Sequence, residues 1–150
     1  MRKVFAALAT LLTLAVVAQF FLAASGAFAT APNEESFQPH RMLGYGIVLF
    51  AVLMTVVAAI SRMPGRVIGM TGLIAGLVLL QGVIRAIASA FGDTGESTTA
   101  GQFIFGLHAI NALVIMALAG TIARRAREVS RSAATNLMTR TGDSQAAPTS

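Results

Sequence analysis

The chain contains only two histidines, and each stands beside or within a long apolar run. His40 belongs to the segment FQPHRMLG at residues 37–44, and His108 belongs to FIFGLHAINAL at residues 103–113. Imidazole nitrogens ligate metal ions and haem iron, and neutral imidazoles also form hydrogen bonds in apolar surroundings. Two histidines on facing helices would supply both axial ligands of a b-type haem. His40 and His108 are therefore the first candidates for a cofactor site, with the haem iron as the metal.

Further polar residues lie within or close to the apolar runs, where polar side chains are costly and are candidates for function. They are Gln19, Arg41, Gln81, Arg85 and Asn111. The two arginines would pair with the two propionates of a haem, since guanidinium groups bind carboxylates through two parallel hydrogen bonds. The ring nitrogen of each histidine that does not bind iron would need a hydrogen-bond partner. The predicted cofactor site consists of the two histidines and these five residues.

Structural roles for the same residues remain open. His40 follows a proline at an expected helix start and would then be an ordinary interfacial residue. His108 would instead bond to a glutamine of another span and hold the two helices together. Arg85 would extend its side chain toward the membrane surface from near the end of its span. Each of these alternatives requires no cofactor.

Four apolar runs must position these groups, and each is long enough to cross a bilayer, which needs about 20 helical residues. The predicted spans are residues 4–24, 42–60, 67–91 and 101–123. None shows the period-two alternation of barrel strands. The predicted fold is an all-α membrane protein, an antiparallel bundle of four transmembrane helices that forms one domain over residues 1–127. The segment 128–150 is predicted to be a disordered tail, because its apolar content is too low for a packed core.

The composition supports lipid as the solvent of this domain. Of the 150 residues, 55% are hydrophobic and 11% are charged, whereas a soluble domain has about a quarter charged residues. The absence of cysteine excludes disulfides and thiolate metal sites. The net charge of +5 lies mainly at the ends of apolar runs, without interleaved aromatic residues, so we expect no nucleic-acid partner. The spans hold no carboxylate and no Ser-His-Asp set, and we expect no stand-alone catalytic activity.

The basic residues predict the orientation, because cytoplasmic flanks of membrane spans collect lysine and arginine. If four helices alternate, nine basic residues share one side: Arg2, Lys3, Arg62, Arg66, Arg124, Arg125, Arg127, Arg131 and Arg140. The opposite side receives Arg41 together with the acids Glu34, Glu35, Asp93 and Glu96. We therefore expect a multi-pass protein of the plasma membrane with both termini in the cytoplasm.

The N-terminus permits a second interpretation. MRK, an apolar run and AFA at residues 27–29 are also typical of a cleavable secretory signal. The apolar run is about 20 residues long, whereas the apolar part of a signal peptide usually has about 7–15. This length favours a retained first helix, and in either case residue 30 would lie outside the cell.

A weak internal repeat relates the two halves of the chain. Each half has a glutamine in its first span and an F-x-x-H motif at the start of its second span, Phe37 to His40 and Phe105 to His108. Two such hairpins, related by an axis along the membrane normal, would place the second and fourth spans across from each other. By helix rise, His40 would lie about 33 Å and His108 about 24 Å above the basic anchor of its helix, a mismatch of about 9 Å. Helix tilt, about 20° on average, would absorb part of it.

Three segments carry a resemblance to known proteins: AQFFLAASGAF, FQPHRMLGYGIVL and GLHAINALVIMALAG. They resemble a family of small four-span actinobacterial membrane proteins of unknown function, over residues 4–127. More distantly, PHRMLGY and LHAINAL resemble the two histidine segments in one half of haem A synthase, a doubled four-helix bundle whose histidines ligate haem. That resemblance implies His40 and His108 as axial ligands. Haem A synthase has a glutamate where this chain has Phe37, and it has two halves, so haem binding or electron transfer is implied rather than haem hydroxylation.

Three functions remain in view at this point. The first is a small b-haem-binding or redox-associated bundle. The second is a non-catalytic accessory subunit without a cofactor, which would use glycine-rich helix faces to hold another membrane complex or a second copy of itself. The third is a site for a quinone or another small lipophile between the helices. All three functions require that the protein is embedded in a lipid bilayer.

Overall fold

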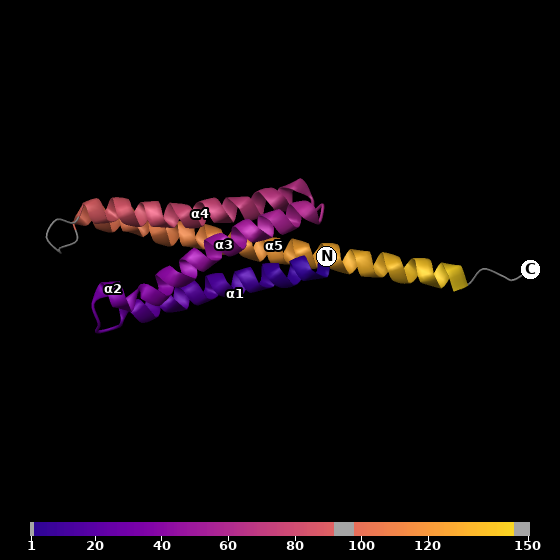
Figure 1. Cartoon of the computed structure of the whole chain (residues 1–150), viewed down its shortest axis with the longest axis horizontal. Helices are drawn as coiled ribbons and strands as arrows, with labels where there is room; N and C mark the ends of the chain where they lie inside the picture. The colour runs from indigo at the N-terminus through magenta and orange to yellow at the C-terminus, as the bar shows by residue number, and fades with distance from the viewer. Residues whose placement is uncertain (1, 92–97, 146–150) are drawn as a thin grey trace, which may run out of the picture.

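The computed structural model describes residues 2–91 and 98–145 of the chain and contains no strand among them. Its helices, labelled in Figure 1, are α1 (Arg2–Ala27), α2 (Asn33–Ser36), α3 (Gln38–Ile60), α4 (Gly65–Ala90) and α5 (Thr99–Gln145). Four of these helices are long and apolar enough to cross a membrane, and α2 is a single short turn between the first two of them. The predicted all-α architecture with four spans is confirmed.

The short connection between α3 and α4 follows from its sequence. Pro64 precedes α4 and cannot donate a backbone hydrogen bond to continue α3. Arg62 adopts a left-handed backbone conformation (φ 50°), and the backbone N–H of Met63 returns to the carbonyl of Ala58 at 3.0 Å. This bond satisfies a carbonyl that the end of a helix would otherwise leave unpaired. At the other end of α3, Pro39 lies in the first turn, where no N–H is needed.

The C-terminal segment differs from the prediction. Residues 128–150 were expected to be disordered, yet α5 continues through Gln145 and is 47 residues long. Residues 124–141 contain neither glycine nor proline and are rich in alanine and arginine, which favour helix. At about 1.5 Å per residue, α5 is about 70 Å long, more than twice the thickness of a bilayer's hydrocarbon core. Its C-terminal part projects alone past the other helices (Figure 1); residues 146–150 lie outside the described part of the chain.

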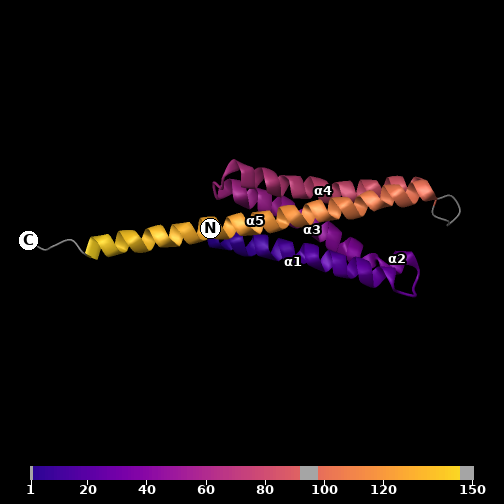
Figure 2. The same ribbon diagram turned by 180° about the vertical axis from the view of Figure 1, so that it is seen from behind.

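The four long helices form a ring of neighbours. α1 packs on α3 and α5, and α4 packs on the same two helices. α3 and α5 therefore occupy opposite corners, which is the arrangement that the internal repeat predicts. Figures 1 and 2 show α3 crossing obliquely, beside α1 at the end near α2 and beside α4 at the other end. We call the end with α2 the histidine end, and the end with the α3–α4 turn, residues 61–64, the basic end.

The closest packing lies toward the basic end. Phe5, Ala9 and Leu12 of α1 have no exposed surface. They share one apolar cluster with residues of α3 and α5, among them Ala51, Met54, Ala58, Ala119, Ile122 and Ala126. The many small side chains let helix backbones approach closely, which is how helices associate in lipid. This buried cluster holds together the helices that carry the groups at the histidine end.

Candidate functional site

The structure brings the two histidines together. His40 is in the first turn of α3 and His108 is in the third turn of α5, and their ring centres lie 6.2 Å apart with the ring planes tilted by 44°. The expected depth mismatch does not separate them. In Figures 1 and 2 the α4–α5 hairpin reaches past α2, and α3 runs obliquely, so the start of α3 lies level with a deeper turn of α5.

The ring of His40 is held by α1. Its Nδ1 lies 3.1 Å from the backbone carbonyl oxygen of Gln19. A carbonyl oxygen only accepts hydrogen bonds, so Nδ1 carries the proton and donates it. In the neutral ring this leaves the lone pair on Nε2, which is the arrangement of a metal-binding histidine whose other nitrogen is fixed by a carbonyl.

The phenylalanine of each F-x-x-H motif contacts its histidine. Phe105 stacks on His108 with ring centres 5.1 Å apart and planes 15° apart, and Phe37 meets the edge of His40 at 6.4 Å and 88°. Residues three apart share one face of a helix, so the motif itself favours these contacts. Nδ1 of His108 is buried and has no hydrogen-bond partner among the described residues. The ring of His40 is thus held by a hydrogen bond and a ring contact. In the described part of the chain, the ring of His108 is held by stacking alone, and its buried Nδ1 is unused.

The two glutamines lie beside the histidine of their own half. Gln81 donates from Nε2 to the backbone carbonyl of His108 at 3.0 Å. The Gln19 amide lies against α3 at Gly44, where a Cβ atom would come within 3.0 Å of its Nε2. The side-chain oxygens of both glutamines are buried without a partner in the described part of the chain. The glutamines therefore support the histidine pair and also leave two acceptors unused.

Asn111 lies one turn further along α5 from His108. Its Nδ2 donates to the backbone carbonyl of Leu77 at 2.8 Å, and the residue is buried. This bond ties α5 to α4 below the histidine pair. The observed role of Asn111 is thus to hold the two helices of one hairpin in register.

Both arginines of the predicted site meet one carboxylate at the histidine end. Glu34 of α2 places Oε2 3.1 Å from Nη2 of Arg41 and Oε1 3.2 Å from Nη2 of Arg85. Arg41 also donates to the backbone carbonyl of Glu34. From the sequence, Glu34 was assigned only to the outer side, and this contact was not predicted because Arg85 is 51 positions away along the chain. One signal for this contact was present in the sequence: Glu34 is an acid on the same predicted side of the membrane as Arg41.

The donor set limits which metal would fit. Within residues 2–91 and 98–145, no group of three or more His, Cys, Asp or Glu side chains is arranged to hold a metal ion. Two imidazoles are too few for a zinc site, which takes three or four protein ligands. They are sufficient for an iron whose four remaining ligands come from a porphyrin, because only the axial positions are then left to the protein. The residues present fit a haem better than a bare ion.

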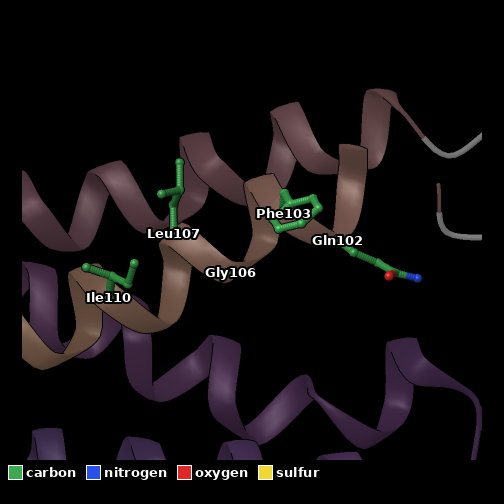
Figure 3. Close-up of a pocket in the computed structure, with 5 residues that line it drawn as sticks. All are labelled: Gln102, Phe103, Gly106, Leu107 and Ile110. Carbon is green, nitrogen blue, oxygen red and sulfur yellow. The ribbon is translucent and has the colours of Figure 1, made fainter. Parts of the chain in front are cut away.

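An open apolar groove of about 390 Å³ lies on α5, close to this region. Its lining residues are Gln102, Phe103, Gly106, Leu107 and Ile110. Figure 3 shows that all five belong to α5, and neither histidine is among them. Because it is formed by the outer face of one membrane-spanning helix, the groove is separate from the histidine pair and contributes no polar ligand to it.

Residues 19–88 match the model of a family of unknown function, DUF6220. The match covers the chain from the second half of α1 through most of α4, so it includes His40, Gln81 and Arg85 but not His108. The predicted resemblance to a family of unknown function is confirmed. No curated protein and no solved structure matches the chain, and the resemblance to haem A synthase stays a prediction.

Proposed function

We propose that this multi-pass membrane protein binds a b-type haem with His40 and His108 as axial ligands and carries single electrons. The supporting observation is the 6.2 Å separation of the two ring centres. A metal–imidazole bond of about 2.0 Å, added to about 1.1 Å from a ring nitrogen to its ring centre, puts two ligating rings roughly 6.2 Å apart across one ion. The observed spacing is compatible with two imidazoles that share one metal, and this supports the proposal.

The surroundings of the pair support this assignment. The Gln19 carbonyl fixes the proton of His40 on Nδ1 and frees Nε2 for a ligand, and Phe105 restrains the ring of His108 by stacking. A bound haem supplies reversible one-electron transfer at its iron. Two imidazoles would fill both axial positions and leave none for a substrate. This favours an electron carrier over an enzyme.

The proposed location is the plasma membrane, with the basic end in the cytoplasm. Lys3, Arg62, Arg66 and Arg124 gather at or next to the basic end, and Glu34 lies at the histidine end. Lysine and arginine mark the cytoplasmic flank of membrane spans. The haem would then lie in the outer half of the membrane. Asp93 and Glu96, which belong to the same prediction, lie outside the described residues.

An absorption spectrum tests the proposal. The full-length protein, produced with ample haem and purified in detergent, is expected to show a Soret band and a six-coordinate low-spin spectrum. His40→Ala and His108→Ala should each abolish that spectrum. His108→Met, which supplies a thioether ligand, should retain haem and shows that loss in the alanine variant is not a folding failure.

Phe103→Ala is the matched control, because Phe103 is on α5 but its side chain is 78% exposed. It should leave the spectrum unchanged. A colourless full-length protein, or a Soret band indifferent to both histidine substitutions, would contradict haem ligation by this pair.

A second candidate function is an accessory subunit that binds another membrane complex through the projecting part of α5. The supporting observation is the length of α5, which continues through Gln145, well past the apolar run predicted over residues 101–123. Arg124, Arg125, Arg127 and Arg131 make the start of this extension strongly basic. Truncation after Ser132, which removes the part of the extension beyond its basic start, is expected to release such a complex during purification. If the partner stays bound to the truncated protein, this function is wrong.

A further inference from the structure

The contact between Glu34, Arg41 and Arg85 is built like a ligand site. Each oxygen of one carboxylate meets a different guanidinium, one from α3 and one from α4. Guanidinium groups are suited to carboxylates because their N–H groups form a planar fork. The two arginines thus define a position where a carboxylate fits, and Glu34 occupies it from the short helix α2.

This position lies next to the histidine pair. Arg41 follows His40 directly in α3, and Arg85 follows Gln81 by four residues on the same face of α4. Gln81 in turn donates to the backbone of His108. Arg41 is therefore the direct neighbour of one histidine of the pair. Arg85 lies one helical turn from Gln81, which contacts the other histidine.

Glu34 is weakly held in this position. Its side chain is 76% exposed, and that of Arg85 is 49% exposed. Exposed ion pairs contribute little to stability because water and salt screen them. Glu34 also belongs to a helix of only four residues. These ion pairs of Glu34 therefore contribute little to the stability of the bundle.

We propose that Glu34 is an internal stand-in for a carboxylate of the cofactor, and that a haem propionate displaces it from Arg41 and Arg85 when haem binds. This inference rests on the proposed function and adds to it the residue that competes with the cofactor. Glu34 then acts as a latch in one sense only: it holds Arg41 and Arg85 in the unliganded protein until a propionate takes its place.

Competition makes a direct prediction about affinity. The full-length apoprotein in detergent is titrated with haem and with haem dimethyl ester, which has no free carboxylates, and the Soret band is recorded. Glu34→Gln should bind haem about fivefold more tightly than the wild type, since it removes a weak exposed ion-pair network. Its affinity for the dimethyl ester should be unchanged, which also shows that the variant is folded.

Glu35→Gln is the matched control, because it removes the same charge from the neighbouring residue, for which no ion pair is observed in the described residues. It should leave both affinities unchanged. Adding Arg85→Gln to Glu34→Gln should remove the fivefold gain in haem affinity, because the propionate then loses one of its two guanidinium partners.

Two failures are distinguishable. If a Soret band forms but Glu34→Gln behaves like Glu35→Gln, or binds haem more weakly than the wild type, the latch is wrong and haem binding stands. If no variant gives a Soret band with either compound, the proposed function is wrong and the propionate site with it.

Discussion

The two halves of the bundle satisfy their polar side chains in different ways. Toward the basic end, the threonine hydroxyls donate to backbone carbonyls one turn earlier in their own helix. The residues are Thr10, Thr13, Thr55, Thr71 and Thr121. These bonds require no neighbouring helix. The helices of this half are therefore free to pack through apolar and small side chains alone.

Toward the histidine end, polar side chains reach across to other helices. His40, Gln81 and Asn111 each bond to a backbone carbonyl of a neighbouring helix. Other buried atoms find no partner in the described residues, namely Oε1 of Gln19, Oε1 of Gln81 and Nδ1 of His108. An unpaired buried polar atom is destabilising.

From this difference we infer that the basic-end half contributes mainly to stability, and that the histidine end is the candidate site. The threonine side chains of the basic-end half bond within their own helices, whereas the histidine end contains polar groups whose hydrogen-bonding capacity is only partly used. Such violations concentrate at functional sites. We therefore expect substitutions in the basic-end half to change the free energy of unfolding, and those at the histidine end to change ligand binding.

The largest effect is expected from a cavity in the basic-end core. Leu12→Ala removes a side chain with no exposed surface and should lower the free energy of unfolding by about 2 kcal/mol. Leu11→Ala, whose side chain is 54% exposed, should change it by less than about 0.5 kcal/mol. Equilibrium unfolding in mixed micelles measures both. Equal losses for the two neighbours would remove the distinction between core and lipid-facing residues.

A smaller effect should separate the two kinds of polar contact. Asn111→Leu breaks the bond from α5 to α4 and should lower the free energy of unfolding by about 0.6 kcal/mol or more, up to about 1.7 kcal/mol, the average and the maximum for hydrogen bonds between membrane helices. Thr71→Val removes a buried hydroxyl that bonds only within α4, so the change should stay within about 0.5 kcal/mol. The same unfolding assay applies. A larger loss for Thr71→Val would reverse the comparison.

The smallest effect comes from two glycines of α3. Gly46→Ala adds a methyl group with nothing within 4 Å and should stabilise the helix by roughly 0.5 kcal/mol. Gly44→Ala places its Cβ 3.0 Å from Nε2 of Gln19, so it should bring no gain and should weaken haem binding at His40. Thermal unfolding and haem titration of both variants measure this. Equal behaviour would show that Gln19 does not need the space at Gly44.

The fold was largely predictable from the sequence, because a membrane span is set by a local quantity, the length of an apolar run. The structure has the four helices long and apolar enough to cross a membrane that the sequence predicts, whereas the continuation of α5 was not expected. Its continuation through Gln145 depends on helix propensity and the absence of a breaking residue rather than on apolar content. The short helix α2 was missed for a related reason, since four polar residues have no periodic pattern.

The candidate site was predictable only in part. The F-x-x-H repeat indicated that His40 and His108 are equivalent, and the structure places them on opposite corners of the bundle. The estimate from helix rise put them at different depths, because it treated the helices as upright and their anchors as level. The role of Glu34 could not be derived, since it depends on which residue of α4 faces α2.

The sequence by itself determined that four helices cross the membrane and that a few polar groups must accompany them into lipid. Both follow from the free energy of moving side chains and backbone groups out of water, which depends on the composition of each segment by itself. Only the tertiary structure decided that two of those groups meet. The two histidines meet because α3 runs obliquely and the α4–α5 hairpin is offset along the bundle. Both features depend on which helix faces can approach closely, and small side chains favour such approach.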